Sequence, residues 1–260
     1  MARPLSELLS ALEEVVGKDA TRRVQARAGA ASAAALAPSM SWVHRTGKSG
    51  DWRSVLEARQ LGAQRVDTPF ETARSLDRAV YFFVGACAYP RGIVALLVSP
   101  RAASAAPSTF TPYDSGALKA HLLPQDSAAP WDDEAKTRHM AAHLGDTADM
   151  AGFLGPYLAG HFRDPLDYVR RPQKSAPDFP AYHGLVDADR RSWTIEVRVH
   201  GDVKIAPDGL TVEEIWLDNQ DLWDDLPDDF KRLARVPPEG QRLEVAVARR
   251  IESRSRRGHA

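Results

Sequence analysis

The chain has only one cysteine, Cys87, in 260 residues. A single cysteine cannot form a disulfide within the chain, and it excludes a zinc site built from four cysteines. Long apolar runs are missing too, because stretches such as 79–84 and 93–98 are far shorter than the roughly 20 residues that cross a bilayer. Glu13 and Glu14 interrupt the N-terminal segment where a secretory signal needs apolar residues. We therefore expect a cytoplasmic protein with no signal peptide and no membrane contact.

A strong charge of one sign is also absent. The sequence has 34 Lys and Arg against 35 Asp and Glu, a net charge of -1. This balance removes the whole-chain electrostatic argument for nucleic-acid binding. A phosphate-binding glycine loop is lacking as well, since Gly47-Lys48-Ser49 matches only the end of that motif and Trp42 stands where its first glycine belongs. A kinase or another P-loop protein is therefore not expected.

Residues 1–38 have the pattern of two helices. Apolar residues recur at helical spacing over 4–16, where Ser6 is a suitable N-cap. The Ala- and Arg-rich segment 20–36 favours a second helix, which Pro38 ends. We interpret these residues as a helical leader.

The rest of the chain predicts both strands and helices. Aromatic, β-branched or alternating stretches predict strands at 42–46, 79–85, 93–99, 193–199, 212–217 and 243–247. Residues 101–130 are rich in Ala, Ser and Pro and predict a long surface loop or lid. Residues 132–168 predict two or three short helices, because glycines interrupt them.

The fold class that follows is α+β. We expect a split, mixed or antiparallel sheet in a unit over 39–248, with the N-terminal helices before it and 132–168 as a helical insertion. The last residues, 249–260, hold five Arg and are expected to form a basic, flexible tail.

Three short motifs carry the functional prediction. His44-Arg45-Thr46 lies on an early predicted strand, Val80-Tyr81-Phe82-Phe83 on the next, and Glu213-Glu214-Ile215-Trp216-Leu217 on a late one. In this order the chain, over roughly residues 42–217, resembles the His-Tyr-Glu class of ADP-ribosyltransferases, which includes diphtheria toxin and the poly-ADP-ribose polymerases. The resemblance implies that the protein uses NAD as a substrate and transfers ADP-ribose after cleaving the nicotinamide–ribose bond.

The resemblance also assigns roles to residues. His44 would bind a ribose hydroxyl, and the adjacent backbone at Arg45 and Thr46 would hold the nicotinamide amide. Tyr81 would stack on the nicotinamide ring, with Tyr89 on its other side. Tyr113 and Asp114, in the loop that could cover a ligand, would lie near it.

The catalytic carboxylate remains open among three glutamates. Bond cleavage generates an oxocarbenium-like ribose, and a nearby carboxylate can stabilise the charge that appears in the transition state. We place Glu214 first, Glu213 second and Glu196 third. Glu213 and Glu214 are neighbours, so on a regular strand only one of them faces the cleft. Glu196 points to the opposite face from its apolar neighbours Ile195 and Val197.

Other functions stay in view. His139 and His143 have the i, i+4 spacing of metal ligands on one helical face, and His161 or Asp146 could complete a site for a metal-dependent hydrolase. Cys87 could act as a nucleophile. A third alternative is a non-catalytic nucleotide-binding or regulatory module. For the transferase, the acceptor is a protein, a nucleic acid or a small molecule, and a partner or antitoxin protein is a further candidate.

Overall fold

The structure of the chain is a computed structural model. It describes residues 2–46, 51–66, 68–85, 92–99, 107–119, 131–170, 183–185, 190–205 and 210–257.

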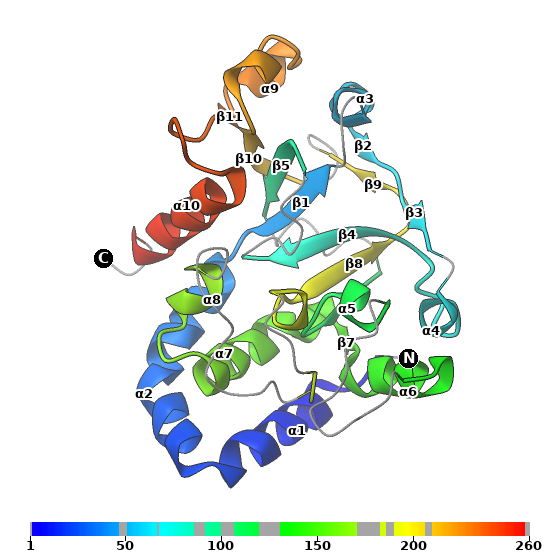
Figure 1. Cartoon of the computed structure of the whole chain (residues 1–260), viewed down its shortest axis with the longest axis vertical. Helices are drawn as coiled ribbons and strands as arrows, with labels where there is room; N and C mark the ends of the chain where they lie inside the picture. Colours follow the sequence, from blue (N-terminus) through cyan, green and yellow to red (C-terminus); the bar gives the residue numbers. More distant parts are fainter. Residues whose placement is uncertain are drawn as a thin grey trace.

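Helices and strands alternate irregularly along these residues (Figure 1). The helices are α1 (Leu5–Lys18), α2 (Ala20–Leu36), α3 (Asp51–Ala58), α4 (Pro69–Thr72), α5 (Ser115–Lys119), α6 (Asp133–His143), α7 (Met150–His161), α8 (Leu166–Arg170), α9 (Asp228–Lys231) and α10 (Leu243–Arg257). The strands are β1 (Trp42–Thr46), β2 (Gln60–Leu61), β3 (Gln64–Arg65), β4 (Arg78–Val84), β5 (Val94–Val98), β6 (Ser108–Thr111), β7 (Gly145–Asp146), β8 (Glu196–His200), β9 (Val203–Lys204), β10 (Val212–Leu217) and β11 (Ala234–Arg235).

The main sheet joins the early and late strands of the sequence. Its order in the described part of the chain is β11-β10-β5-β1-β4-β8-β6-β7, with β3 added beside β4. Neighbouring strands are antiparallel except for the parallel pair β10 and β11. Sheet and helices together confirm the predicted α+β class. The blocks at 42–98 and 196–217 pair in one sheet, since β10 joins β5 and β8 joins β4.

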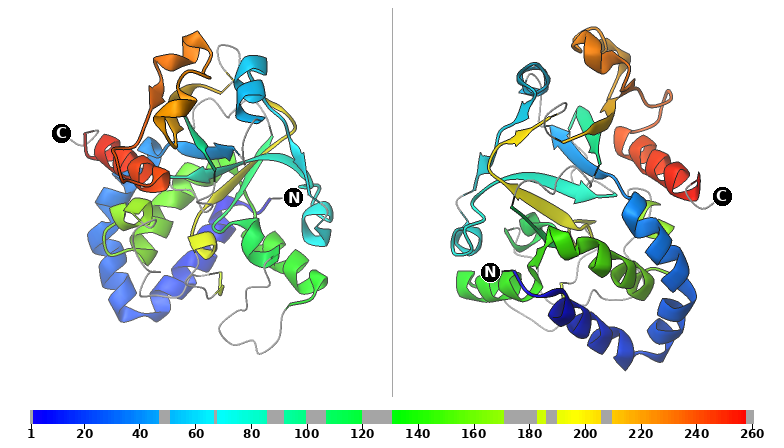
Figure 2. Two further views of the ribbon diagram at one scale, coloured as in Figure 1. Left: turned by 45° about the horizontal axis from the view of Figure 1, so that its top comes forward. Right: turned by 180° about the vertical axis from the view of Figure 1, so that it is seen from behind.

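The two leader helices form part of the core. Both pack against α7 on one side of the sheet, and the buried Leu8 and Leu12 of α1 belong to the same apolar cluster as the strands (Figure 2). The side chain of Asp19 caps α2 by accepting from the backbone N–H of Thr21 at 2.8 Å and of Arg22 at 3.1 Å. The predicted cap at Ser6 is wrong, because α1 begins at Leu5, before that residue.

The C-terminal prediction is also wrong. Residues 243–247, expected as a last strand, start α10, and this helix continues to Arg257 through most of the predicted flexible tail. Five alternating residues fit a strand, but Leu243, Val247 and Ile251 at i, i+4 and i+8 give α10 a buried face. Helix α10 packs on α8 and β10.

The predicted loop and insertion each contain regular structure. Strand β6 and helix α5 lie within 101–130, while residues 101–106 and 120–130 lie outside the described part of the chain. The insertion at 132–168 consists of short helices, as predicted, together with β7, which pairs with β6. None of the helices in the described segments is long and apolar enough to span a membrane.

We expect Gly145→Ala to destabilise the fold by about 2 kcal/mol, the middle of the range for overpacking a core. An added Cβ at Gly145 would lie 2.5 Å from Cζ of Phe110 and 2.9 Å from Cδ1 of Leu8, both fully buried. Thermal unfolding followed by circular dichroism measures the loss. Gly17→Ala is the matched control, because its Cβ would meet nothing within 4 Å and the variant should keep or raise the melting temperature.

Candidate functional site

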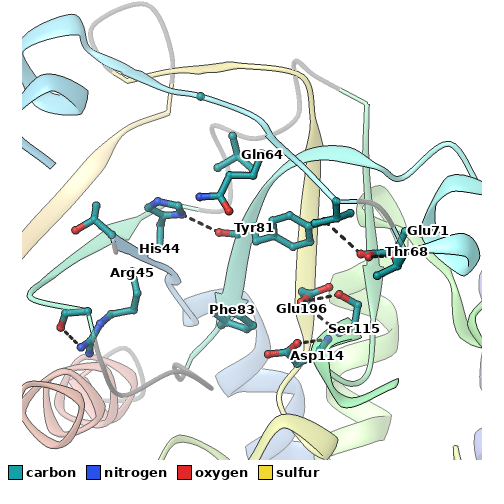
Figure 3. A pocket seen from close by; sticks show the side chains of 16 residues that line it. His44, Arg45, Gln64, Thr68, Glu71, Tyr81, Phe83, Asp114, Ser115 and Glu196 are labelled. Carbon is teal, nitrogen blue, oxygen red and sulfur yellow. Dashed lines mark hydrogen bonds between the residues drawn. The ribbon is translucent and has the colours of Figure 1, made fainter. Parts of the chain in front are cut away.

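A pocket of about 420 Å³ opens where the main sheet divides (Figure 3). This volume lies within the range of small-molecule sites. Strands β1, β4 and β8 supply His44, Tyr81 and Glu196 to its lining, and α4 and α5 add Glu71 and Ser115.

The pocket exists because β1 and β4 separate. Their ladder holds only the pairs Trp42↔Val84 and Val43↔Phe83, whereas β1 pairs with β5 along all five of its residues. Beyond Val43 the strands diverge, and the side chain of His44 crosses the gap. Its Nδ1 lies 2.8 Å from the backbone carbonyl oxygen of Tyr81.

This contact defines the tautomer of His44. A carbonyl oxygen can only accept a hydrogen bond, so Nδ1 carries the proton and donates a hydrogen bond to the backbone carbonyl of Tyr81. Burial lowers the pKa of His44 below its ordinary value, against the raising effect of the hydrogen bond to Tyr81. The ring is therefore neutral near pH 7, and its Nε2 is a hydrogen-bond acceptor.

Tyr81 is held at its hydroxyl end. Its phenol donates to Oε1 of Glu71 at 3.2 Å, and the hydroxyl of Thr68 donates to the other oxygen of the same carboxylate. Burial, and then the charge of Glu71, raise the pKa of Tyr81 well above its ordinary value. Tyr81 is therefore a fixed, neutral aromatic ring in the pocket lining.

Glu196 is the carboxylate beside this ring. Strand alternation sends it and Arg198 to one face of β8, while Val197 and Val199 enter the core on the other. Its Oε2 accepts from the backbone N–H and the hydroxyl of Ser115, each at 3.3 Å, and Arg198 forms an ion pair with Oε1.

The surroundings of Glu196 disfavour its charge. The residue is 2% exposed, and this burial raises the pKa of its carboxyl well above the ordinary value. Arg198 opposes the shift, while the nearby carboxylates of Asp114 and Glu71 add to it. Raised pKa values of this kind are typical of acid–base and charge-stabilising groups in clefts.

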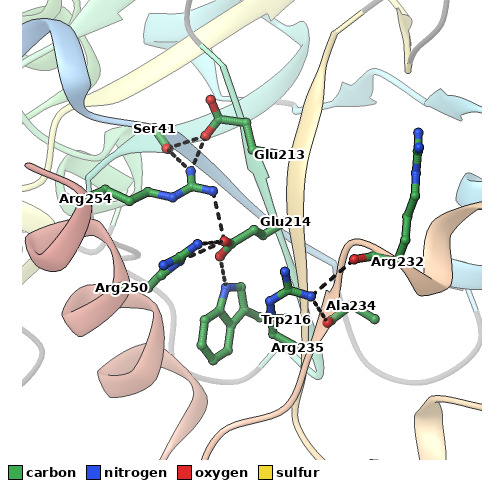
Figure 4. A network of polar contacts seen from close by, with 9 residues as sticks. All are labelled: Ser41, Glu213, Glu214, Trp216, Arg232, Ala234, Arg235, Arg250 and Arg254. Atoms are coloured by element: carbon green, nitrogen blue, oxygen red, sulfur yellow. Dashed lines mark hydrogen bonds and ion pairs between the residues drawn. The ribbon is translucent and has the colours of Figure 1, made fainter. Parts of the chain in front are cut away.

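Glu213 and Glu214 lie outside the pocket and bind α10 instead (Figure 4). Oε1 of Glu214 accepts from Nε of Arg250 at 2.7 Å and pairs with Arg254 at 2.9 Å, while Oε2 accepts from Nε1 of Trp216 at 3.0 Å. Glu213 accepts from Ser41 at 2.8 Å and from Arg254 at 2.5 Å.

A β-bulge explains why both glutamates meet the same arginine. The register of β10 against β5 shifts between Val212 and Glu214, which breaks the alternation of faces at Glu213. The sequence ranking that placed Glu214 and Glu213 before Glu196 is therefore not supported, because Glu196 is the one that lines the pocket.

The other expected ligand contacts divide into three groups. Arg45 and Thr46 line the pocket, and Arg45 donates to the carbonyl of Gly92. Tyr89, like Cys87, lies outside the described residues. Tyr113 is fully buried away from the pocket lining, but the residues that follow it, Asp114 and Ser115, belong to that lining.

The histidines of the metal hypothesis form an aromatic cluster. The rings of His139 and His143 have centroids 4.4 Å apart and pack on Tyr113, whereas His161 packs on Tyr157. Burial lowers the pKa of His139 to about 2, of His143 to about 4 and of His161 to about 3. Within the described residues, no group of three His, Cys, Asp or Glu could hold a metal ion, so the hydrolase alternative has no ligand set there.

Sequence reasoning missed several polar residues in or behind the pocket, among them Glu71, Ser115 and Arg198. A signal existed for two of them: Thr68-Pro69-Phe70-Glu71 has the spacing of a capping box, and Glu196-Val197-Arg198 puts two charges on one face of an apolar strand. Ser115 carried no comparable signal.

Comparison of the chain with models of protein families, with curated proteins and with solved structures found no match.

Proposed function

We propose that this chain is an NAD-dependent ADP-ribosyltransferase-like enzyme that cleaves the nicotinamide–ribose bond in the pocket between β1, β4 and β8. The observation that carries the proposal is that His44, Tyr81 and Glu196, three residue types in the chain order of the His-Tyr-Glu class, line one cavity. Each comes from a different strand, so folding is required to bring them together.

Charge development gives Glu196 its proposed role. When the bond between ribose and the nicotinamide nitrogen breaks, the electron pair leaves with nicotinamide, and positive charge moves onto the ribose. A carboxylate at that position stabilises the transition state more than the substrate, which is the condition for raising kcat. Ser115 holds the Glu196 carboxylate before substrate binds.

Tyr81 and His44 have binding roles in this proposal. The ring of Tyr81, held by Glu71, offers a flat face to nicotinamide with little loss of conformational entropy. The free acceptor position of His44, its Nε2, suits a ribose hydroxyl, which can donate to it. The proposed acceptor of ADP-ribose is a protein, a nucleic acid or a small molecule, and a partner or antitoxin protein would act on this reaction from outside the pocket.

We expect His44→Ala to raise the KM for NAD about fivefold with a smaller effect on kcat. The variant loses a binding hydrogen bond, which contributes about 1 kcal/mol, and about 1.4 kcal/mol corresponds to a tenfold change. Initial rates of nicotinamide release, measured by chromatography over a range of NAD concentrations, give both constants.

His200→Ala is the matched control for that measurement. His200 lies on β8 but outside the pocket lining, where it contacts the hydroxyl of Thr109 at 3.2 Å. Equal KM values for wild type and His44→Ala would contradict the role of His44. NAD binding by the wild type without any nicotinamide release would reject the enzyme and favour the non-catalytic nucleotide-binding module.

A further inference from the structure

Arg198 is a fully buried charge behind the pocket. Its residue exposure is 0%, although it lies only two positions from Glu196 and pairs across the sheet with Tyr81. Removing a guanidinium from water is costly unless its partners compensate. The partners of Arg198 therefore indicate why the residue is there.

Those partners are groups of the proposed site. Nη2 of Arg198 pairs with Oε1 of Glu196 and donates to Oγ1 of Thr111 at 3.1 Å, and Nε lies 3.9 Å from Oε1 of Glu71. Glu71 in turn accepts from the hydroxyl of Tyr81. One guanidinium thus connects the carboxylate beside the pocket to the carboxylate that fixes the aromatic ring.

Stability alone is a weak reason for this arrangement. Buried ion pairs can often be replaced by apolar side chains of similar volume without loss of stability. A planar guanidinium is useful where the orientation of a carboxylate matters, because its nitrogens have fixed directions: Nη2 contacts Glu196 and Thr111, while Nε faces Glu71. Glu196 is such a carboxylate in the proposed reaction.

We propose that Arg198 is a positioning residue of this pocket, which aims the Glu196 carboxylate at the ligand and favours its charged form. This inference rests on the proposed function. Arg198 itself does not line the cavity, so it acts through Glu196.

The groups around Glu196 make this role sensitive to pH. They are Glu71 from α4, Tyr81 from β4, Tyr113 and Asp114 before α5, Ser115 within α5, and Arg198 on β8 itself. Burial raises the pKa of Glu196, and Asp114 and Glu71 raise it further, whereas Arg198 and the hydrogen bonds from Ser115 lower it. Loss of Arg198 removes the positive charge that opposes protonation.

Arg198→Met should therefore shift the acid limb of the kcat profile upward by about 1–3 pH units, the usual effect of a close opposite charge. Its kcat should fall about 10–100-fold, because a misplaced catalytic group can cost that much. The KM for NAD should change little, since Arg198 is outside the cavity lining. Arg198→Lys keeps the charge but loses the fork, so it should restore the pH profile while kcat stays about tenfold low.

The experiment combines two measurements on the full chain. Nicotinamide release gives kcat and KM against pH for the wild type and both variants. Carbon-13 NMR of labelled glutamate carboxyls, with the Glu196 signal assigned from Glu196→Gln, gives the titration of Glu196 without any turnover. Arg170→Met is the matched control, because Arg170 pairs with Asp164, Asp167 and Glu252 outside the pocket and should leave both measurements unchanged.

The results separate this inference from the proposed function. An upward shift of the Glu196 titration in Arg198→Met, reversed in Arg198→Lys, supports the effect of Arg198 on the charge of Glu196 whether or not NAD is cleaved. An unshifted titration together with wild-type kcat in both variants overturns it. If Arg198→Met does not fold, Arg198→Lys decides: a wild-type kcat overturns the inference, and a tenfold loss with an unchanged titration supports it. Absence of nicotinamide release from the wild type rejects only the proposed reaction.

Discussion

Replacing Glu196 with Gln should lower kcat for nicotinamide release from NAD by about 10²–10³-fold, the usual cost of losing one preorganised group at a developing charge. Gln has nearly the same shape and can still accept from the backbone N–H and the hydroxyl of Ser115. What it lacks is the negative charge that would face the ribose as nicotinamide leaves. The loss should therefore appear mainly in kcat, with the KM for NAD little changed.

The substitution should not cost stability at neutral or alkaline pH. Because the folded-state pKa of Glu196 is raised, the folded protein holds its proton more tightly than the unfolded chain does. Any stabilisation from this group is present at low pH and is lost as the pH rises through the raised pKa. A neutral amide avoids that loss, so Glu196→Gln should melt at or above the wild-type temperature at pH 8.

Glu213→Gln is a suitable control for the kinetic measurement. Glu213 belongs to the late-strand motif of the sequence, and its carboxylate pairs with Arg254 rather than lining the pocket. We expect its nicotinamide release to equal that of the wild type. Equal rates of nicotinamide release in wild type and Glu196→Gln would reject Glu196 as the catalytic carboxylate. A large loss of release in Glu213→Gln would favour a catalytic glutamate on β10 instead.

Local periodicity predicted the leader helices and the longer strands of this fold correctly. The helices of the leader and the strands at 42–46 and 212–217 follow from patterns that repeat over several residues. The segment 243–247 was misassigned because five residues fit a period of two, while the helical period needs Ile251 to become visible. Its helical state depends on packing against β10 and α8, which no local pattern encodes.

The site shows the same division between local and long-range information. His44 and Tyr81 could be predicted because each lies on a regular strand within a recognisable motif, and both line the pocket. The sequence could not predict which glutamate lines the pocket. That outcome depends on a bulge in β10 and on two arginines of α10, more than 35 positions away, that pair with Glu214. The partner that a carboxylate finds across the fold determines whether it remains available for a ligand.

Glu214→Gln should therefore behave as a stability variant. We expect a loss of about 3 kcal/mol and a melting temperature lower by roughly 6–12 °C, because hydrogen bonds to charged groups contribute about 1.5–3 kcal/mol each. The expected loss is smaller than the sum of the separate hydrogen bonds, because the side chains of Arg250 and Arg254 are 31% and 26% exposed and can bind water in the variant. Differential scanning calorimetry measures the change, and nicotinamide release per folded molecule should stay at the wild-type value.

The pH dependence of that loss identifies its cause. Burial of Glu214 works to raise its pKa, but the donors of Arg250 and Trp216 and the charge of Arg254 outweigh it, and the pKa lies below the ordinary value of 4.5. A lowered folded-state pKa contributes stability in full above the unfolded value, and this contribution disappears as the pH falls through the folded value. The difference between wild type and Glu214→Gln should thus be constant above pH 5 and shrink below about pH 4.5.

Glu213→Gln again supplies the comparison, because its partly exposed pair with Arg254 should contribute less than about 1 kcal/mol. If the two variants lose equal stability, the bulge does not distinguish the roles of their carboxylates. If Glu214→Gln keeps its melting temperature and loses nicotinamide release, the carboxylate that α10 binds here reaches the ligand instead, and both the anchoring role of Glu214 and the catalytic role of Glu196 are wrong. A large fall in the melting temperature of Glu214→Gln with wild-type nicotinamide release would mean that Glu214 anchors α10 to the sheet through Arg250 and Arg254. Glu196 of β8 would then remain the catalytic carboxylate.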